Sequence, residues 1–259
     1  ITPQHGGTFI DCTFGQGGYT KKILSFKNTQ VIALDRDEAS KKSAERILKE
    51  FQNRFIFKNK KFSQIDNLKL KNENVRGIVF DLGYSYTQIK DPTKGLSFSS
   101  DGDLNMKMGI NDFSAKEAIN FLEETDLEKI FKYFGDEKDA KKISNKIIKK
   151  RIHKSLTTKD LVEIINKEKK NYNFKINKST KIFQSLRIFV NQEISELIFG
   201  LINAYNLLPV NGYIIIVTFH SIEDRIVKFF FKNYSEDKKI SRYLPQAKNL
   251  NKVFEKLNK

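Results

Sequence analysis

Three carboxylates and a cluster of glycines have the residue types and the spacing of a ligand site. Asp11 ends a short apolar run, and Gly15, Gly17 and Gly18 follow directly, before a helix-like pattern that begins at Lys21. Glycines permit a tight turn and let the backbone approach a ligand, while a helix N-terminus offers unpaired N–H groups to an anion. The stretch therefore predicts a strand, a ligand-binding turn and a helix; a glycine-rich loop without a ligand is the competing interpretation.

Two further carboxylates follow predicted strands. The apolar run 30–34 ends at Asp35, roughly 20 residues beyond the glycines, where nucleotide-binding α/β folds place an acid against ribose hydroxyls. A later run, 77–80, ends at Asp81. Since ligands of open parallel sheets gather at the carboxyl ends of the strands, we expect Asp11, Asp35 and Asp81 to converge there. For Asp35, a simple cap on the next helix is the alternative.

The elements that position these residues alternate along the chain as in an α/β fold. Apolar runs predict strands at 8–11, 30–34, 55–57, 77–83 and 213–219. Periodicity predicts helices at 38–51 and 222–231, the latter capped by Ser221 with Asp224. From residue 112 the pattern becomes helical, over 114–124, 126–134, 137–150 and 157–169. We therefore expect a sheet domain formed by 1–111 and 179–259, and a helical insert at 112–178.

One long helix is expected over 181–208, after a polar linker at 168–178. Its apolar stripe consists of Phe183, Leu186, Val190, Ile194, Leu197 and Leu201. A second stripe, made of Gln184, Arg187 and Asn191, is polar. Such a stripe favours either a lined cleft or a plain exposed face.

The stretch 84–108 joins the fourth strand to the helical part and is long for a loop. It carries Tyr84, Tyr86, Leu96, Phe98, Leu104, Met106 and Met108 among glycine, serine and aspartate residues. Because aromatic and apolar side chains argue against disorder, we expect a packed loop over the site.

The chain has 259 residues, with 47 Lys and Arg against 31 Asp and Glu and a formal net charge of +16. Such a surplus favours a polyanionic partner because binding releases counterions, although a lysine-rich composition can also reflect genome bias. The single cysteine, Cys12, excludes an internal disulfide and fits a reducing compartment; its place in a buried strand favours a core role over a nucleophile. No apolar run approaches the ~20 residues of a membrane span.

Six segments of the chain resemble the RsmH (MraW) family, S-adenosylmethionine-dependent methyltransferases of N4 of a cytidine in the decoding region of small-subunit ribosomal RNA. They lie at 11–18, 33–37, 81–85, 95–98, 183–191 and 219–225. Because they occur in family order over most of the chain, the match is more specific than one glycine loop. The resemblance implies an α/β, Rossmann-like class I methyltransferase domain with an inserted all-helical domain that recognises the substrate.

The resemblance also implies contacts to the cofactor, S-adenosyl-L-methionine. By motif position these fall at Gly17, Gly18, Tyr19, Asp35, Phe62, Asp81 and Gln88. Tyr19 stands where the family usually has histidine. Tyr86-Thr87 replaces Ser-Pro and Asn105 replaces aspartate, and both changes concern the acceptor pocket. From the residues alone, Phe62 could stack on an adenine or belong to the core.

The implied reaction is an in-line displacement in which a cytosine amino nitrogen attacks the methyl carbon of the sulfonium, so alignment matters more than covalent catalysis. Since the nitrogen lone pair is delocalised into the ring, an acceptor must hold an N–H. Asp81 is the candidate, with cofactor binding alone as the alternative. His220 is a second catalytic candidate, with a purely structural histidine as the alternative. No metal ligand is expected.

The target base must leave its stack, and Tyr84, Tyr86 and Phe98 are the expected stacking partners unless they form loop core. Contacts to RNA are expected from Arg187 and Asn191, and from Lys141, Lys142, Lys149 and Lys150 of the insert. A solvated helix face is the simpler interpretation of these lysines.

Other classes share parts of this pattern. A dinucleotide oxidoreductase would have the glycine loop and the ribose acid, but not the Asp81 motif or the basic insert. A non-catalytic RNA-binding protein would explain only the charge, and a methyltransferase of small molecules or of another RNA would keep the fold. We therefore expect small-subunit ribosomal RNA or the small subunit as the partner, no membrane, and a bacterial cytoplasmic location, with an organellar matrix as the alternative. The oligomeric state, monomer or homodimer, stays open.

Overall fold

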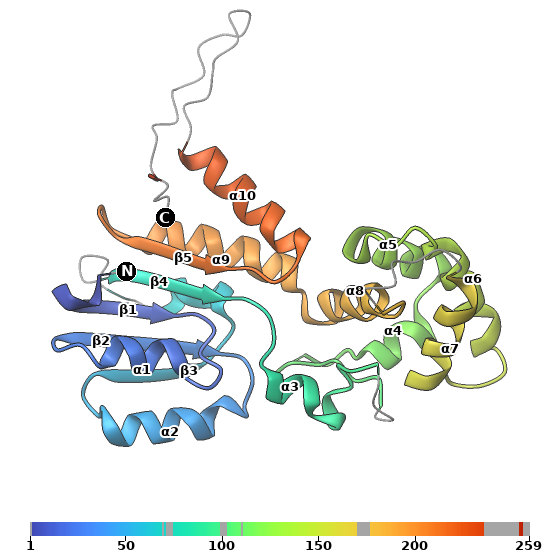
Figure 1. Cartoon of the computed structure of the whole chain (residues 1–259), viewed down its shortest axis with the longest axis horizontal. Helices are drawn as coiled ribbons and strands as arrows, with labels where there is room; N and C mark the ends of the chain where they lie inside the picture. Colours follow the sequence, from blue (N-terminus) through green and yellow to red (C-terminus); the bar gives the residue numbers. More distant parts are fainter. Residues whose placement is uncertain are drawn as a thin grey trace, which may run out of the picture.

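The computed structural model describes residues 2–68, 70, 75–98, 103–109, 111–169, 177–235 and 254–255. Two parts lie next to each other along the long axis of the molecule (Figure 1). One is an α/β part that holds the N-terminus, and the other is entirely helical. The predicted fold class is confirmed: a Rossmann-like α/β domain with an all-helical region.

The described residues form one sheet of five parallel strands, in the order β3-β2-β1-β4-β5. The strands are β1 (Gly7–Asp11), β2 (Thr29–Asp35), β3 (Phe55–Asn59), β4 (Val75–Asp81) and β5 (Tyr213–Val217). Each coincides with a predicted strand, and Asp11, Asp35 and Asp81 are the last residues of β1, β2 and β4, as predicted. The strand order reverses between β1 and β4, which is where open α/β sheets form a ligand crevice.

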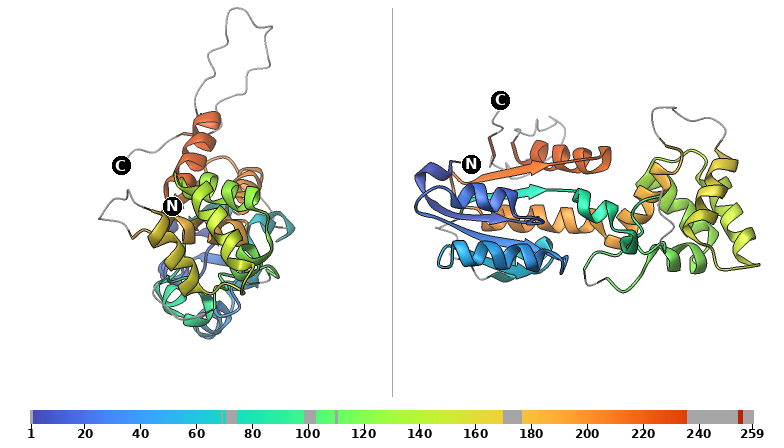
Figure 2. Two further views of the ribbon diagram at one scale, coloured as in Figure 1. Left: turned by 90° about the vertical axis from the view of Figure 1, so that its right-hand side faces the viewer. Right: turned by 60° about the horizontal axis from the view of Figure 1, so that its bottom comes forward.

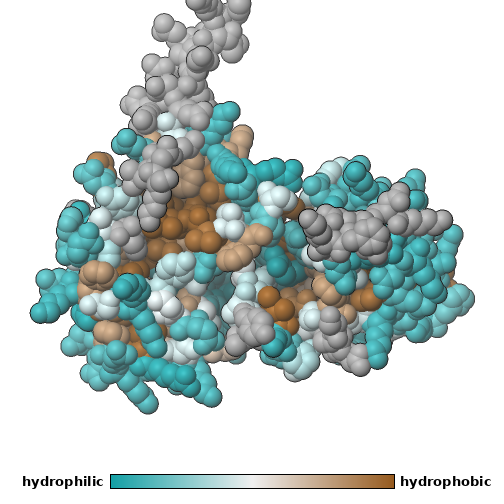
Figure 3. All heavy atoms as spheres, in the orientation of Figure 1, coloured by the Kyte–Doolittle hydropathy of each residue, from teal (hydrophilic) through white to brown (hydrophobic). Residues whose placement is uncertain are grey.

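Helices cover both faces of the sheet (Figure 2). They are α1 (Gly18–Leu24), α2 (Ser40–Glu50), α9 (Glu193–Leu207) and α10 (Ser221–Ser235), with the 3-10 turn η2 (Phe62–Leu68). Since alternate residues of a strand point to opposite faces, Phe9 packs with α1 and α2, whereas its neighbour Ile10 packs in the core formed with α9 and α10. In Figure 3, apolar residues gather over β5 beside α10, while the helical end presents mostly hydrophilic residues.

The helical part has a core of its own. Its helices are α4 (Ala115–Phe121), α5 (Glu124–Gly135), α6 (Ala140–Arg151), α7 (Thr158–Glu168) and α8 (Thr180–Asn191). Ser114 and Thr157 begin α4 and α7 with capping boxes. The core also takes in Leu104 and, from α8, Phe183 and Leu186. Packing therefore groups α8 with the helical part, beyond the predicted limit at residue 178.

The single helix predicted over 181–208 is wrong. Gln192 adopts the left-handed conformation, with φ 53° and ψ 34°, so that α8 ends at Asn191 and α9 begins at Glu193. The predicted apolar stripe consequently enters two cores, because Leu186 packs in the helical part and Leu197 against the sheet.

The predicted packed loop over 84–108 contains a short helix, α3 (Tyr86–Lys90), and the 3-10 turn η4 (Pro92–Lys94). Leu104, Met106 and Met108 are buried, which confirms packing for the described residues of this stretch. The polar linker predicted at 168–178 lies mostly outside the described residues. Among the helices that the structure describes, none has the length and apolar character that crossing a membrane requires.

Candidate active site

A cavity of about 340 Å³ opens at the carboxyl ends of the strands, within the size range of small-molecule sites. It reaches from the ends of β2 and β3, near Asp35 and Phe62, across the loop after β1, to the ends of β4 and β5, near Asp81 and Phe219. The predicted site residues that line it are Gly18, Tyr19, Asp35, Phe62, Asp81, Tyr84 and Gln88. Residues far apart in the sequence therefore form one cavity at the predicted edge of the sheet.

Asp35 holds the glycine loop in place. Its Oδ2 accepts hydrogen bonds from the Gly15 N–H at 2.7 Å and from the Ser40 hydroxyl at 2.8 Å, and its Oδ1 accepts one from the Asp37 N–H at 2.7 Å. Burial raises the pKa of this carboxyl. Asp35 is not the cap of α2, whose N-cap residue is Ala39 without a side-chain cap hydrogen bond. It holds the glycine loop and the turn before α2, while Oδ1 keeps the capacity to accept a hydrogen bond from a ligand hydroxyl.

The two glycines at the start of α1 have different functions. Gly17 has φ 81°, and a Cβ there would clash with Ile47 Cδ1, so packing of the loop against α2 requires glycine. A Cβ on Gly18 would meet no atom within 4 Å, and Gly18 lines the cavity. This open approach to the backbone fits the amino acid end of the predicted cofactor.

Asp11 supports the loop from beneath and is not part of the cavity lining. Its carboxylate is buried and accepts hydrogen bonds from the Thr20 hydroxyl at 2.7 Å and from the Thr13 N–H at 3.3 Å. Burial, with a smaller contribution from the charge of Asp35, raises its pKa to about 6. The three strand-end carboxylates do lie at one edge, but only Asp35 and Asp81 line the cavity.

Asp81 lines the cavity, and in the described part of the chain its carboxylate has no hydrogen bond or ion pair. Its N–H donates to Thr13 Oγ1 at 2.7 Å, which fixes the start of the loop after β4 against the loop after β1. Burial raises the pKa of the Asp81 carboxyl. Burial and, to a smaller extent, the charge of Asp81 raise the pKa of Tyr19. The Tyr19 hydroxyl therefore lies close enough to the end of β4 to interact electrostatically with Asp81.

Gln88 ties the loop after β4 to the end of β2. Its amide nitrogen donates to Asp37 Oδ2 at 2.7 Å, and its Oε1 accepts from the Ser85 N–H at 2.9 Å. Asp37 also pairs with Lys94 at 3.0 Å, which closes the loop over the site. At the other end of the cavity, the Phe62 ring packs edge-on against Phe80, with 5.5 Å between the ring centroids. Phe62 also lines the cavity, so it is both part of the core and available to a ligand.

Arg187 belongs to the junction between the two parts. Its Nε and Nη2 donate to the two carboxylate oxygens of Glu193, both at 2.9 Å. The Tyr84 hydroxyl donates to Glu193 Oε1 at 2.7 Å, and the guanidinium lies 4.5 Å from the centre of the Tyr84 ring. Although burial alone would lower the pKa of Arg187, Glu193 and Tyr84 raise it. Arg187 is therefore already paired, which does not favour the predicted phosphate contact.

Asn191 is completely buried, which argues against both interpretations of its polar stripe and against contact with RNA. Its Nδ2 donates to the Met106 carbonyl at 2.8 Å, and its Oδ1 accepts from the Met108 N–H at 2.9 Å. Its own carbonyl accepts from Arg36 Nη1 at 2.9 Å. Asn191 thus joins the end of α8 to the preceding linker and to the end of β2.

The predicted stacking residues have other neighbours. The Tyr84 hydroxyl is bound by Glu193, and burial followed by that carboxylate raises its pKa well above the usual value. Phe98 packs edge-on against Phe183, 5.8 Å away, at the border of the helical core. The side chain of Tyr86 lies outside the described residues.

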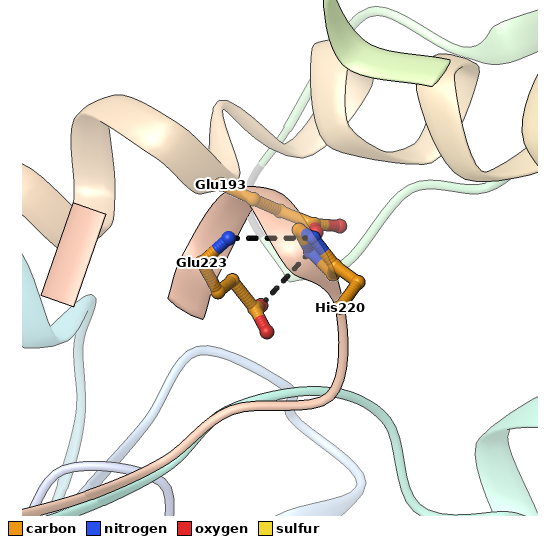
Figure 4. Close-up of side chains that lie close together, drawn as sticks. All are labelled: Glu193, His220 and Glu223. Carbon is orange, nitrogen blue, oxygen red and sulfur yellow. Dashed lines mark hydrogen bonds and ion pairs between the residues drawn. The ribbon is translucent and has the colours of Figure 1, made fainter. Parts of the chain in front are cut away.

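His220 lies behind the cavity and is absent from its lining. Figure 4 shows it between two carboxylates, Glu193 and Glu223. His220 Nε2 lies 3.1 Å from Glu223 Oε1, and the Glu223 N–H donates to Nδ1 at 3.5 Å. One ligand atom from each side chain falls within 4.8 Å of the others, a spacing compatible with a metal. Since Arg187 already neutralises Glu193, we assign the cluster to the domain junction.

Glu223 accepts the hydrogen bond that stabilises the N-terminal end of α10, a role that was predicted for Ser221 with Asp224. Its Oε2 accepts a hydrogen bond from the Phe219 N–H at 3.0 Å. Although burial would raise it, the contacts with His220 and the Phe219 N–H lower the pKa of Glu223. Sequence reasoning singled out His220 in this motif, and missed Phe219 and Glu223, which line the cavity.

A five-stranded parallel sheet of this order, with a glycine loop and strand-end acids around one cavity, is the arrangement of a Rossmann-like domain that binds a nucleotide-containing cofactor. The family model described as the MraW methylase family matches residues 1–259, and the chain belongs to this family.

Relatives carry the same class of activity in their names. The chain is 42% identical over 237 residues to the Ribosomal RNA small subunit methyltransferase H of Rickettsia canadensis, covering 91% of this chain and 77% of that protein. Identity to the protein of the same name from Ehrlichia canis is 41%, over 92% of this chain and 82% of the relative. The Ehrlichia ruminantium protein is 37% identical and covers 100% of this chain, which spans 86% of it.

Proposed function

We propose that this chain transfers a methyl group from S-adenosyl-L-methionine to the N4 amino group of a cytidine in the decoding region of small-subunit, 16S-type ribosomal RNA. Membership of the MraW methylase family and the names of the relatives support the class of enzyme and substrate. Because the substrate would be ribosomal RNA, the protein would act where small subunits are assembled. The single observation that carries the choice of an amino group is the environment of Asp81.

The cofactor would lie along the cavity, with its methionine end at Gly18, its ribose at Asp35 and its base near Phe62. When bound, it supplies an activated methyl group on a sulfonium. Asp35 would accept hydrogen bonds from the ribose through Oδ1, and Gln88 would hold the loop after β4 closed by its bond to Asp37. These residues bind and orient, which is the main demand of an in-line transfer.

Asp81 would act on the nucleophile. Its carboxylate lines the cavity on the β4 side, has no protein partner among the described residues, and has a raised pKa because it is partly buried. A carboxylate in this position can accept the N–H of an exocyclic amine and take its proton as the nitrogen forms its new bond. Proton acceptance by Asp81 is the proposed chemical role.

The environment of Cys12 favours nitrogen over carbon as the acceptor. Methylation of a cytosine ring carbon is helped by a thiolate that adds to the ring, and the thiolate is the nucleophilic form of cysteine. Cys12 is the single cysteine of the chain, and burial raises the pKa of its thiol well above the usual value. A thiol held in the neutral form is poorly suited to such an attack.

The helical part would contact the RNA. Exposed lysines on α6, among them Lys141, Lys146 and Lys149, have no ion pair in the described part of the chain. Two of the predicted lysines are engaged: Lys142 pairs with Asp139 at 3.1 Å, and Lys150 with Glu163 at 2.7 Å. The free lysines would attract phosphates by a sequence-independent electrostatic contribution.

Methyl transfer from labelled cofactor to isolated small ribosomal subunits tests the proposal, with large subunits and protein-free RNA as parallel substrates. We expect label in the RNA of the small subunit. Label confined to a small molecule or to protein, or cofactor binding without transfer to any subunit, would contradict the proposed function.

A further inference from the structure

Phe219 is an exposed aromatic residue at the acceptor end of the cavity. It lies just beyond β5, whose register pairs Val217 with Asp81 on β4, so Asp81 and Phe219 come from the ends of adjacent strands. The residue is 67% exposed and lines the cavity. A single exposed aromatic residue is not unusual by itself, so the evidence lies in how this ring is held.

The Phe219 ring rests on the backbone of the loop that carries Asp81. Gly83 has φ 110°, and a Cβ there would lie 2.9 Å from Phe219 Cδ2 and 3.4 Å from Cγ. Glycine at this position therefore gives the loop a conformation that other residues rarely adopt and lets the ring approach the chain. The Cδ2 edge of the ring thus lies beside Gly83, while most of the residue is exposed to solvent.

The backbone of Phe219 is fixed by a buried group. Its N–H donates to Glu223 Oε2 at 3.0 Å, and the other carboxylate oxygen of Glu223 lies 3.1 Å from His220 Nε2. Glu223 is 4% exposed. Figure 4 shows Glu223 and His220 together at the start of α10. An exposed ring on a rigid support loses little conformational freedom when a ligand stacks on it.

Other aromatic residues near the acceptor end are less available. The Tyr84 ring is covered by the Arg187 guanidinium, and its hydroxyl is held by Glu193. Phe98 packs on Phe183. Tyr19 also lines the cavity, but it is 41% exposed and lies at the start of α1, beside the glycine loop. Phe219 is therefore the aromatic residue that best combines exposure, support and a place on the β5 side of the cavity.

We propose that the open face of Phe219 is the stacking platform for the unpaired target base, which it holds with the exocyclic amine directed toward Asp81. The ligand class is a pyrimidine nucleobase turned out of its helix. The inference rests on the proposed function, since it assigns the acceptor base to this end of the cavity. Stacking on an aromatic side chain contributes about 1–3 kcal/mol per base, or roughly a 5- to 150-fold change in binding.

The test compares Phe219→Ala with Phe229→Ala, a matched control. Phe229 is 70% exposed on α10 and does not line the cavity. Methyl transfer to small subunits is measured under steady-state conditions, and the affinity for S-adenosyl-L-methionine by equilibrium dialysis. For Phe219→Ala we expect kcat/KM to fall roughly 5- to 150-fold with unchanged cofactor affinity, and for Phe229→Ala no change. Phe219→Trp should retain activity, whereas Phe219→Leu, which keeps apolar contact without an aromatic face, should not.

The outcomes separate this inference from the function beneath it. If the wild-type protein does not methylate small subunits, the proposed function fails. If it does and Phe219→Ala matches Phe229→Ala, the stacking platform is wrong and the function stands. Equal losses of cofactor affinity and of kcat/KM in Phe219→Ala would assign the ring to the cofactor and overturn the inference. Equal activity of Phe219→Leu and Phe219→Trp would also overturn the inference.

Discussion

Carboxylates have opposite environments in the two parts of the molecule. Around the cavity, burial raises the pKa of Asp11, Asp35 and Asp81. On the helical part, hydrogen bonds from Lys150 and Lys167 lower the pKa of Glu163. For Asp160, hydrogen bonds from lysines and Thr157 outweigh the effect of burial and also lower the pKa. Within the described residues, the three strand-end aspartates thus have no cationic partner, whereas Asp160 and Glu163 are each paired with two lysines.

This difference in environment suits the cavity carboxylates to a role in catalysis or ligand binding, and the lysine-paired carboxylates to a structural role. A carboxylate without a cation can take a proton or bind a polar ligand, and perturbed groups of this kind gather at functional sites. A carboxylate paired with lysines on a helix surface keeps its charge and adds little to stability. The remaining lysines of the helical part leave a basic surface for a polyanion.

The largest effect should come from Asp81→Asn. The amide cannot accept the amine proton, so we expect kcat to fall by about 10²- to 10⁴-fold while the cofactor dissociation constant stays within about twofold. Methyl transfer and equilibrium dialysis on the same preparation give both values. In the wild-type protein, activity should fall as the pH is lowered through the raised pKa of Asp81, because the protonated carboxyl cannot act as acceptor. Joint loss of affinity and activity would instead assign Asp81 to cofactor binding.

The ion pair at the junction should contribute more to the free energy of unfolding than the ion pair on the helical surface. Glu193→Ala leaves Arg187, whose side chain is only 21% exposed, without its carboxylate, which we expect to lower the free energy of unfolding by up to about 3 kcal/mol. Glu163→Ala, the matched change on the helical surface, removes a half-exposed partner of Lys150 and Lys167 and should change stability far less, because solvent and salt screen this pair. Denaturant unfolding measures both. Equal losses would show that the junction is no more dependent on its charges than the surface is.

Stability should depend on pH through Asp11. Its pKa is about 6 when folded, against about 3.9 in an unfolded chain, so the folded state binds the proton more tightly. The charged carboxylate therefore costs stability at neutral pH, and this cost disappears as the pH falls through 6 toward 4. Relative to Asp11→Asn, the wild-type protein should gain about 2 kcal/mol between pH 7.5 and pH 4.5. Parallel stability curves for the two proteins would exclude this titration.

The smallest and most distributed effect should come from the free lysines of α6. Charge reversal at Lys141, Lys146 and Lys149 should weaken RNA binding and reduce its salt slope by about 0.7–0.9 for each phosphate that the protein no longer neutralises. The matched control reverses three exposed lysines of the α/β part, at positions 21, 27 and 42. Binding titrations at several salt concentrations distinguish the two triples, and equal slopes would place the RNA elsewhere.

The pattern of apolar runs along the sequence predicted the sheet and the part of the site that lies at the strand ends. Buried parallel strands are continuous apolar runs, so their ends, and with them Asp35 and Asp81, could be located from the sequence. The break at Gln192 could not, because the apolar period continues across it and only the packing of two separate cores reveals it.

The contacts that side chains make with residues on neighbouring elements could not be predicted from the sequence either. The pairing of Arg187 with Glu193 depends on that helix break and on Tyr84, which is distant in the chain. Phe219 was visible within a motif, but its exposure and its contact with Gly83 follow from strand register. Charge and spacing alone would have made Arg187 a phosphate ligand and left Phe219 without a function.

The most direct test of the central claim is the chemical identity of the methylated nucleoside. Small subunits treated with the wild-type protein and S-adenosyl-L-methionine are digested to nucleosides and compared with standards by chromatography and mass spectrometry. Because Asp81 can hold an amine proton and the Cys12 thiol is kept neutral, we predict N4-methylcytidine. A methyl group on a cytosine ring carbon would contradict the roles assigned to both residues.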